Sequence, residues 1–285
     1  MATSPDERRP AGGGALLCVQ RTARGNVVER LRRGERLAPR VLDAGPGAVH
    51  ACLLPTQAGP LSGDHDRARI VVGADATLVV VTITATLALP GPARTRLELD
   101  VEVGPRARLV LEDPPLIVAG GADVERSTTV TLAAGAVAVL RDTVVLGRSG
   151  EAGGRLVSTL RVSDDDGVVL HDALCLDPAT TGRDAHVALA PGHRAAGTIY
   201  LLGSDAHADP RLALARAGAL RRASALGLAE LEAELAGPWA ECAQGVANGR
   251  RPLATYPVTA PSEALETRRA YFARTPLSRA GGGGS

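Results

Sequence analysis

The side chains of this sequence best suited to binding a metal ion lie between Gly59 and Asp66. Asp64, His65 and Asp66 crowd a predicted turn that leads into a predicted strand. Oxygen and imidazole ligands of this kind suit a divalent ion that binds and leaves again. Aspartate after glycine is also ordinary turn chemistry, and we rank that structural role first.

A second candidate ligand is Asp142, which lies in an apolar predicted strand between Leu140 and Val145. A buried carboxylate there is costly unless it is paired with a cation or bound to a metal. We predict either a metal ligand or half of an ion pair, with Arg141 or Arg148 as the partner.

Motifs of common catalytic and cofactor sites are missing from the sequence. It contains no G-x-S-x-G elbow, no phosphate-binding loop and no H-x-x-x-H pair among its six histidines. The cysteines are far apart and include no C-x-x-C pair; they are Cys18, Cys52, Cys175 and Cys242. We therefore expect buried, reduced thiols, a cytoplasmic location and no stably bound cofactor.

The composition restricts the class of protein. The 32 basic residues, all arginine, balance 31 acidic residues and leave a formal charge of +1, which argues against binding nucleic acid or a membrane surface. The segment Arg21–Arg40 is locally basic, which suits an acidic partner, although a solvated strand face explains it better. Residues 2–14 lack the features of a secretory signal, and no apolar stretch reaches the ~20 residues of a spanning helix.

An internal repeat predicts the architecture. Three similar segments carry glycines at Gly73, Gly104 and Gly135, a constant spacing of 31 residues. Each segment is typical of a strand, a tight turn and a second strand, because glycine supplies the turn angles. One such unit cannot bury its apolar face alone, so neighbouring units must stack into a solenoid-like pile of strands. The alternative is a chance likeness among the hairpins of an ordinary β-sandwich.

Changes in composition divide the chain into four parts. We predict a flexible tail over residues 1–14, a β-rich body over 15–208, a helical part over 209–280 and a linker-like Gly/Ser tail over 281–285. Low aromatic content (2%) means that the core consists of Val, Leu, Ile and Ala, which favours strands in the body. Besides the repeat, we expect strands at Leu16–Arg21, Val27–Leu31, Ala48–Leu53, Thr143–Leu146, Arg155–Val162, Val168–Leu174 and Thr198–Leu202.

Helix signals appear only in the C-terminal part. One helix is expected to begin at Asp209-Pro210, where an N-cap precedes a proline at the first position. A second is expected over Leu228–Ala236 and should end at Gly237-Pro238. A third should follow Pro261-Ser262.

Three segments, in this order, resemble the urease accessory protein UreD family, also called UreH. They are Gly59-Pro-Leu-Ser-Gly-Asp64, Val79–Leu89, and Leu140–Arg148 followed by Gly150-Glu151. The resemblance covers about residues 16–205 in order and is looser in the C-terminal part. The chain keeps one glycine where the family usually has a pair, carries Leu87 where lysine is common, and lacks most of the family's aromatic residues.

The resemblance implies a mainly β fold with a stacked-strand, β-helix-like body, a small C-terminal α-helical part and no enzymatic activity. It implies a scaffold that binds apo-urease and a UreF-type protein, which recruits the UreG-type GTPase that brings nickel. Nickel would pass through the interior of the scaffold. The family tends to place polar or acidic groups at the positions of Asp64, Thr86, Asp142 and Asp172. Of the residues in this sequence, Asp64, His65, Asp142 and Asp172 are the candidates for a transient nickel path, and Thr86 is a further site residue.

Two other functions compete with the urease scaffold. A β-solenoid enzyme could act on polysaccharide with paired carboxylates such as Asp64 and Asp142, but few aromatic side chains are present to stack on sugar rings. A β-solenoid assembly module unrelated to nickel is the other alternative. A coding sequence beside urease subunit genes would separate that module from the urease scaffold.

Overall fold

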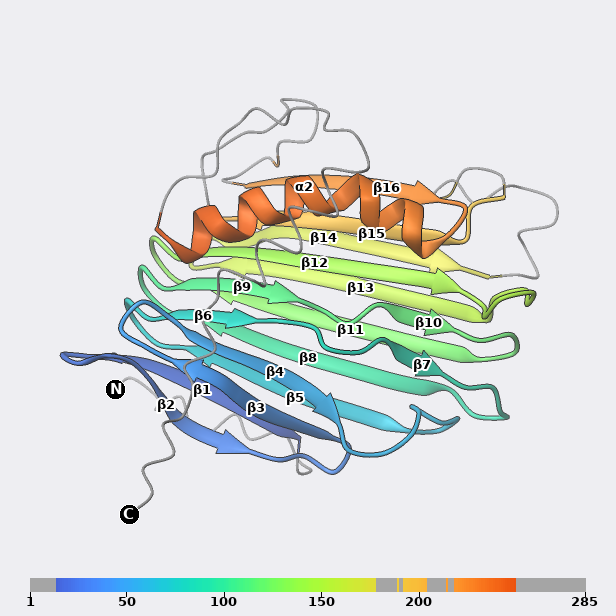
Figure 1. Cartoon of the computed structure of the whole chain (residues 1–285), viewed down its shortest axis with the longest axis horizontal. Coiled ribbons are helices and arrows are strands. Elements are labelled where there is room, and N and C mark those ends of the chain that lie inside the picture. Colours follow the sequence, from blue (N-terminus) through green and yellow to red (C-terminus); the bar gives the residue numbers. More distant parts are fainter. Residues whose placement is uncertain (1–13, 178–188, 190–191, 204–213, 215–217, 250–285) are drawn as a thin grey trace, which may run out of the picture.

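The computed structural model describes residues 14–177, 189, 192–203, 214 and 218–249. Figure 1 shows two sheets facing each other, with the helix α2 (Leu228–Ala247) lying along one of them. The seven-stranded sheet has the order β14 (Gly167–Leu176), β13 (Arg155–Asp164), β11 (Asp123–Leu132), β8 (Thr95–Val103), β5 (His65–Val72), β1 (Ala15–Thr22) and β2 (Gly25–Arg32). The nine-stranded sheet has the order β16 (Gly218–Ala225), β15 (Ala195–Leu202), β12 (Val137–Leu146), β9 (Arg108–Glu112), β6 (Thr77–Val80), β4 (Val49–Pro55) and β3 (Leu37–Ala44), with β10 (Leu116–Val118) pairing β12 and β7 (Thr86–Ala88) pairing β10.

The chain coils between the two sheets. β5, β8 and β11 are each followed, after a tight turn, by β6, β9 and β12 in the opposite sheet, and successive coils pair in parallel. Ile70 of β5 lies beside Val101 of β8, a step of 31 residues. This arrangement confirms the predicted mainly β fold with a stacked-strand, β-helix-like body.

The third coil departs from the predicted constant spacing. Val101 lies beside Val130, a step of 29 residues. Gly135, with φ of 69°, therefore takes the turn position of Arg106, with φ of 54°, and not the position of Gly104. A shift of two residues leaves every side chain on the same face of the sheet, so the apolar pattern cannot reveal it.

Apolar side chains fill two spaces. Inward-facing residues of both sheets form the main interior between them, and a separate cluster joins α2 to the outer face of the nine-stranded sheet. In that cluster Leu231, Leu235 and Trp239 of α2 pack against Val110 and Val139. The helix thus covers one sheet, while the outer face of the seven-stranded sheet carries no described helix.

The described C-terminal part corrects two expectations. Residues 218–225, predicted to belong to a helical part, form β16, which pairs antiparallel with β15 and buries Ala219, Ala223 and Ala225. Helix-forming residues thus accept a strand because sheet pairing outweighs their weak intrinsic preference. The second predicted helix exists, but it continues through Gly237 and Pro238 to Ala247, since burial against the sheet offsets the hydrogen bond lost at proline.

The strands expected outside the repeat are all present, whereas the strands β3, β7 and β10 were not predicted. The tail over residues 1–13, the helices expected at Asp209-Pro210 and after Pro261-Ser262, and the Gly/Ser tail lie outside the described residues. Among the helical residues that the structure describes, none forms a helix with the length and apolar character to cross a membrane.

Candidate functional site

A layer of polar side chains interrupts the apolar interior between the sheets. On β12 the inward-facing positions are Leu140, Asp142 and Val144, and on β11 Arg126 and Thr128 point into the same space because strand side chains alternate. The apolar residues on either side of this layer form two distinct clusters. The polar residues of the layer include Asp66, Asp113, Arg126, Asp142, Ser158, Asp172, Thr198, Tyr200 and Arg222.

Three neighbouring cavities follow this layer along the stack. The first, with about 530 Å³ of empty space including its open part, is lined by Asp142, Asp172 and Tyr200. The second, of about 680 Å³, is lined by Asp66 and Thr86. The first and second share four lining residues, which are Leu99, Asp113, Arg126 and Thr128. The third, of about 470 Å³, includes Arg36 and His65 and shares Leu37 and Asp66 with the second.

The centre of the line is an arginine held between two carboxylates. Nη2 of Arg126 lies 2.5 Å from Oδ1 and 2.6 Å from Oδ2 of Asp142, and Nη1 lies 3.4 Å from Oδ2 of Asp113. Burial raises the pKa of Asp113 to about 6; the charge of Asp142 adds to this rise and Arg126 opposes it. Burial disfavours the charged form of Arg126, but the two carboxylates outweigh this and raise its pKa.

A second ionic cluster lies at the β14 and β16 end of the first cavity. The hydroxyl of Tyr200 donates to Oδ2 of Asp172 at 2.5 Å, and Arg222 pairs with the same oxygen. Arg222 also donates from Nε to the hydroxyl of Thr198 at 3.0 Å. Burial, aided by nearby carboxylate charge, raises the pKa of Tyr200 above its usual value. Asp172 thus contacts two side chains of the opposite sheet.

The predicted turn segment lies at the opposite end of the line. Oδ2 of Asp64 accepts a hydrogen bond from the backbone N–H of Leu61 at 2.5 Å and lies 2.6 Å from Nη2 of Arg36. Nε of Arg36 lies 2.8 Å from Asp66, whose pKa is raised by burial. The geometry therefore gives Asp64 the turn role ranked first from the sequence.

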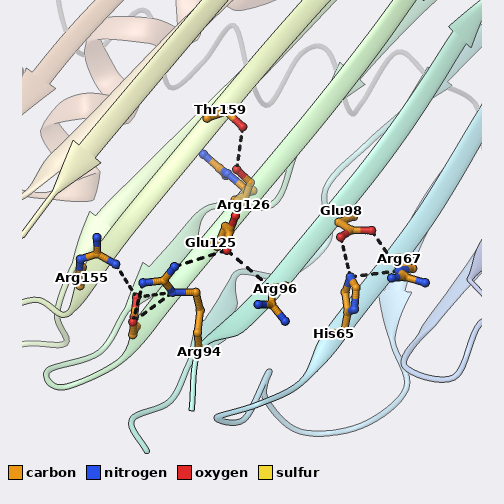
Figure 2. A network of polar contacts seen from close by, with 10 residues as sticks. His65, Arg67, Arg94, Arg96, Glu98, Glu125, Arg126, Arg155 and Thr159 are labelled. Carbon is orange, nitrogen blue, oxygen red and sulfur yellow. Dashed lines mark hydrogen bonds and ion pairs between the residues drawn. The ribbon is translucent and has the colours of Figure 1, made fainter. Parts of the chain in front are cut away.

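His65 belongs to the outer face of the seven-stranded sheet as well as to the rim of the third cavity. Its Nε2 lies 2.8 Å from Oε1 of Glu98, and Arg67 contacts both residues at 3.0 Å. Figure 2 shows this group beside a second network, which includes Arg94 and Arg155. Both of these arginines also donate to Asp123, each at 3.2 Å. Ion pairs between neighbouring strands therefore cover much of this face.

The structure corrects the partner predicted for Asp142. Neither Arg141 nor Arg148 contacts it; Arg126, on the opposite sheet, does. Arg141 pairs with Glu112 at 3.5 Å and with Glu232 of α2 at 2.7 Å. No sequence motif indicated a site role for Arg126, Asp113, Tyr200 or Arg222. A charged residue at an inward-facing position of a repeat strand was the available signal for Arg126.

The four predicted metal ligands and the further site residue Thr86 thus lie along one line of cavities but do not surround a single point. Asp142 and Asp172 line the first cavity, Thr86 the second and His65 the third, while Asp64 pairs with Arg36 at the third. Among the described residues, no group of three or more His, Cys, Asp or Glu side chains is arranged to hold a metal ion. Carboxylates separated along a path can bind an ion only weakly at each position.

Comparison with known proteins identifies the family. The family model described as UreD urease accessory protein matches residues 13–250. This chain belongs to the UreD family. It is 36% identical over 226 residues to urease accessory protein UreD 1 of Streptomyces griseus, covering 77% of this chain and 88% of the relative. It is 37% identical over 214 residues to urease accessory protein UreD of Streptomyces coelicolor, covering 70% and 81% of the two chains.

The third segment that resembles the UreD family contains the second half of β12 and the turn that follows it. Glu151 accepts hydrogen bonds from the backbone N–H groups of Arg148 and Gly120, pairs with the Arg148 side chain, and has its pKa lowered to about 2 mainly by these hydrogen bonds. Arg194 donates to the carbonyl groups of Leu146, Arg148 and Glu151. These hydrogen bonds hold the turn at the C-terminal end of β12, the strand that carries Asp142.

The carboxylates considered for a polysaccharide enzyme are engaged with different arginines. Asp64 pairs with Arg36 next to the third cavity, whereas Asp142 pairs with Arg126 in the first. A glycosidase needs two carboxyl groups that flank one bond of the substrate. Nothing in the arrangement of this pair favours that chemistry.

Proposed function

We propose that this protein is a non-enzymatic scaffold of urease maturation that guides nickel toward the urease active site. Membership of the UreD family supports a role in urease assembly, and both relatives described above are named urease accessory proteins. The observation that carries the nickel role is the line of cavities with Asp66, Asp113, Asp142 and Asp172 in their walls. Oxygen ligands spaced along a path suit an ion that moves on.

The partners proposed are apo-urease and a UreF-type protein, which would bring a UreG-type GTPase. Nickel is cargo in this proposal, and no stably bound cofactor takes part. The four cysteines, all among the described residues, are not joined in disulfides, which supports action in the reducing cytoplasm. We propose no contact with nucleic acid or membranes.

The test is co-expression of the urease genes with variants of this chain in a host that lacks its own urease. Asp142→Ala should still co-purify with apo-urease and the UreF-type protein, because Asp142 faces the interior. Nickel bound per urease should fall by about threefold or more, since one oxygen ligand of the path is lost. Asp165→Ala, in the exposed turn between β13 and β14, is the matched control.

Unchanged nickel loading with Asp142→Ala would refute the role of this carboxylate in the path. Failure of the unaltered chain to co-purify with either partner would refute the scaffold itself. Normal co-purification together with normal nickel loading in Asp142→Ala, Asp113→Ala and Asp172→Ala would favour an assembly module unrelated to nickel.

A further inference from the structure

Arg126 stands where the first and second cavities meet. It lies on the inward face of β11, only 7% of its side-chain surface is exposed, and it belongs to the walls of both cavities. Asp113 and Thr128 share this position. An ion that moved from one cavity to the other would therefore meet the positive charge of Arg126.

The guanidinium group is held on three sides. Both oxygens of Asp142 contact Nη2, Asp113 faces Nη1, and Nε donates to Oγ of Ser158 at 3.0 Å. The neighbouring backbone is also fixed, because the hydroxyl of Thr159 donates to the Arg126 carbonyl oxygen at 3.4 Å (Figure 2). The arginine thus engages the carboxylate oxygens that a passing cation would need.

The guanidinium group of Arg126 and a divalent ion would compete for the same two carboxylates. Two cations that compete for the same carboxylates repel each other. A divalent ion can bind Asp142 and Asp113 only if the guanidinium leaves them, and the flexible side chain lets it do so without unfolding the strand. With Arg126 gone, two carboxylates would face one space without a counter-ion, which is costly until a proton or a metal neutralises them.

We propose that Arg126 is a displaceable counter-ion that closes the passage between the two cavities until a divalent cation replaces it on Asp142 and Asp113. This proposal rests on the proposed nickel path and adds to it a residue that controls passage.

The decisive variant is Arg126→Met in the full chain, tested by titration with nickel(II) chloride in a calorimeter, without urease. We expect one site with a dissociation constant at least about tenfold lower than that of the unaltered chain, because the carboxylates are no longer occupied. The double variant Arg126→Met/Asp142→Ala should lose this site. Arg126→Lys, which keeps the positive charge, should not gain it.

Two further variants guard against failure to fold and against non-specific effects. Arg126→Gln retains hydrogen-bond donors for Asp142 and Ser158, and it replaces the methionine variant where that one does not fold. Arg69→Met removes an arginine from the outer face, where Arg69 pairs with Glu102 at 2.7 Å, and should leave nickel affinity unchanged. Circular dichroism checks that each variant keeps its strand content.

The outcomes separate this proposal from the proposed function. If Arg126→Met and Arg126→Gln fold but bind nickel no more tightly than the unaltered chain, the counter-ion role is overturned. Reduced urease loading with Asp142→Ala would then still support the path. If the arginine variants gain the site while Asp142→Ala loads urease normally, the counter-ion role stands as a property of the cavity and the nickel path fails.

Discussion

Replacing Asp113 with asparagine should change how the stability of the protein depends on pH. Asp113 directly follows β9 and lies near Arg126, and burial raises the pKa of its carboxyl group from 3.8 to about 6. The native protein therefore holds this proton at a pH where the unfolded chain has lost it. Its contribution to stability is fully present below about pH 4 and is lost as pH rises through about 6.

The magnitude follows from the size of this pKa shift. A shift of this size corresponds to at most about 3 kcal/mol in the free energy of unfolding. The side chain keeps 33% of its surface exposed, so water in the cavity weakens the effect. We expect the unfolding free energy of Asp113→Asn, relative to that of the unaltered protein, to rise by about 1 kcal/mol between about pH 4.5 and pH 7.5.

Urea unfolding followed by the fluorescence of Trp239, the single tryptophan, provides the assay. Trp239 is buried between α2 and the sheet, so its emission reports loss of the native packing. Asp165→Asn, in an exposed turn, controls for the change in net charge and should show no such trend. A difference between Asp113→Asn and the unaltered protein that stays constant or shrinks with rising pH would refute the reasoning.

Two further predictions test the packing. In Gly197→Ala the new methyl group would lie 2.5 Å from Cδ1 of Leu235 on α2, so the unfolding free energy should fall by about 1–3 kcal/mol. Gly45→Ala is the control, because the space around Gly45 is open. Equal stability of the two variants would show that the contact with Leu235 relaxes freely. Cys175 is exposed and the other three cysteines are buried. A thiol reagent should therefore modify one thiol in the native protein and the other three only after unfolding. Rapid modification of all four thiols would contradict this burial.

Local sequence patterns predicted most of the strands. Alternating apolar residues and glycine turns fix which residues are extended and which face of each strand is buried. The same logic failed at Gly218–Ala225, where alanine, leucine and arginine indicated a helix but pairing with β15 produced a strand. The predicted end of α2 at Gly237-Pro238 was also wrong, because packing against the sheet stabilises the helix beyond Pro238.

The candidate site was predictable only in part. An aspartate between Leu140 and Val145 indicated a buried carboxylate that needs a partner, and the structure provides one. Closeness in the sequence favoured Arg141 or Arg148 as the partner of Asp142. The actual partner, Arg126, reaches Asp142 across the space between the two sheets. Ion pairs of this kind depend on which strands face each other across the interior. Local sequence does not show which residues of distant strands come into contact.

The sequence by itself determined the alternation of inward and outward residues, the positions of most turns and the presence of charged groups at buried positions. Tertiary structure decided the register of the coils, including the step of 29 residues between Val101 and Val130, and thereby placed Arg126 between Asp113 and Asp142. The physical reason is that successive side chains of a strand point to opposite faces of the sheet. The alternation of apolar and polar residues in the local sequence therefore shows which side chains are buried. Which side chains meet across the interior follows from hydrogen bonding and packing between whole coils.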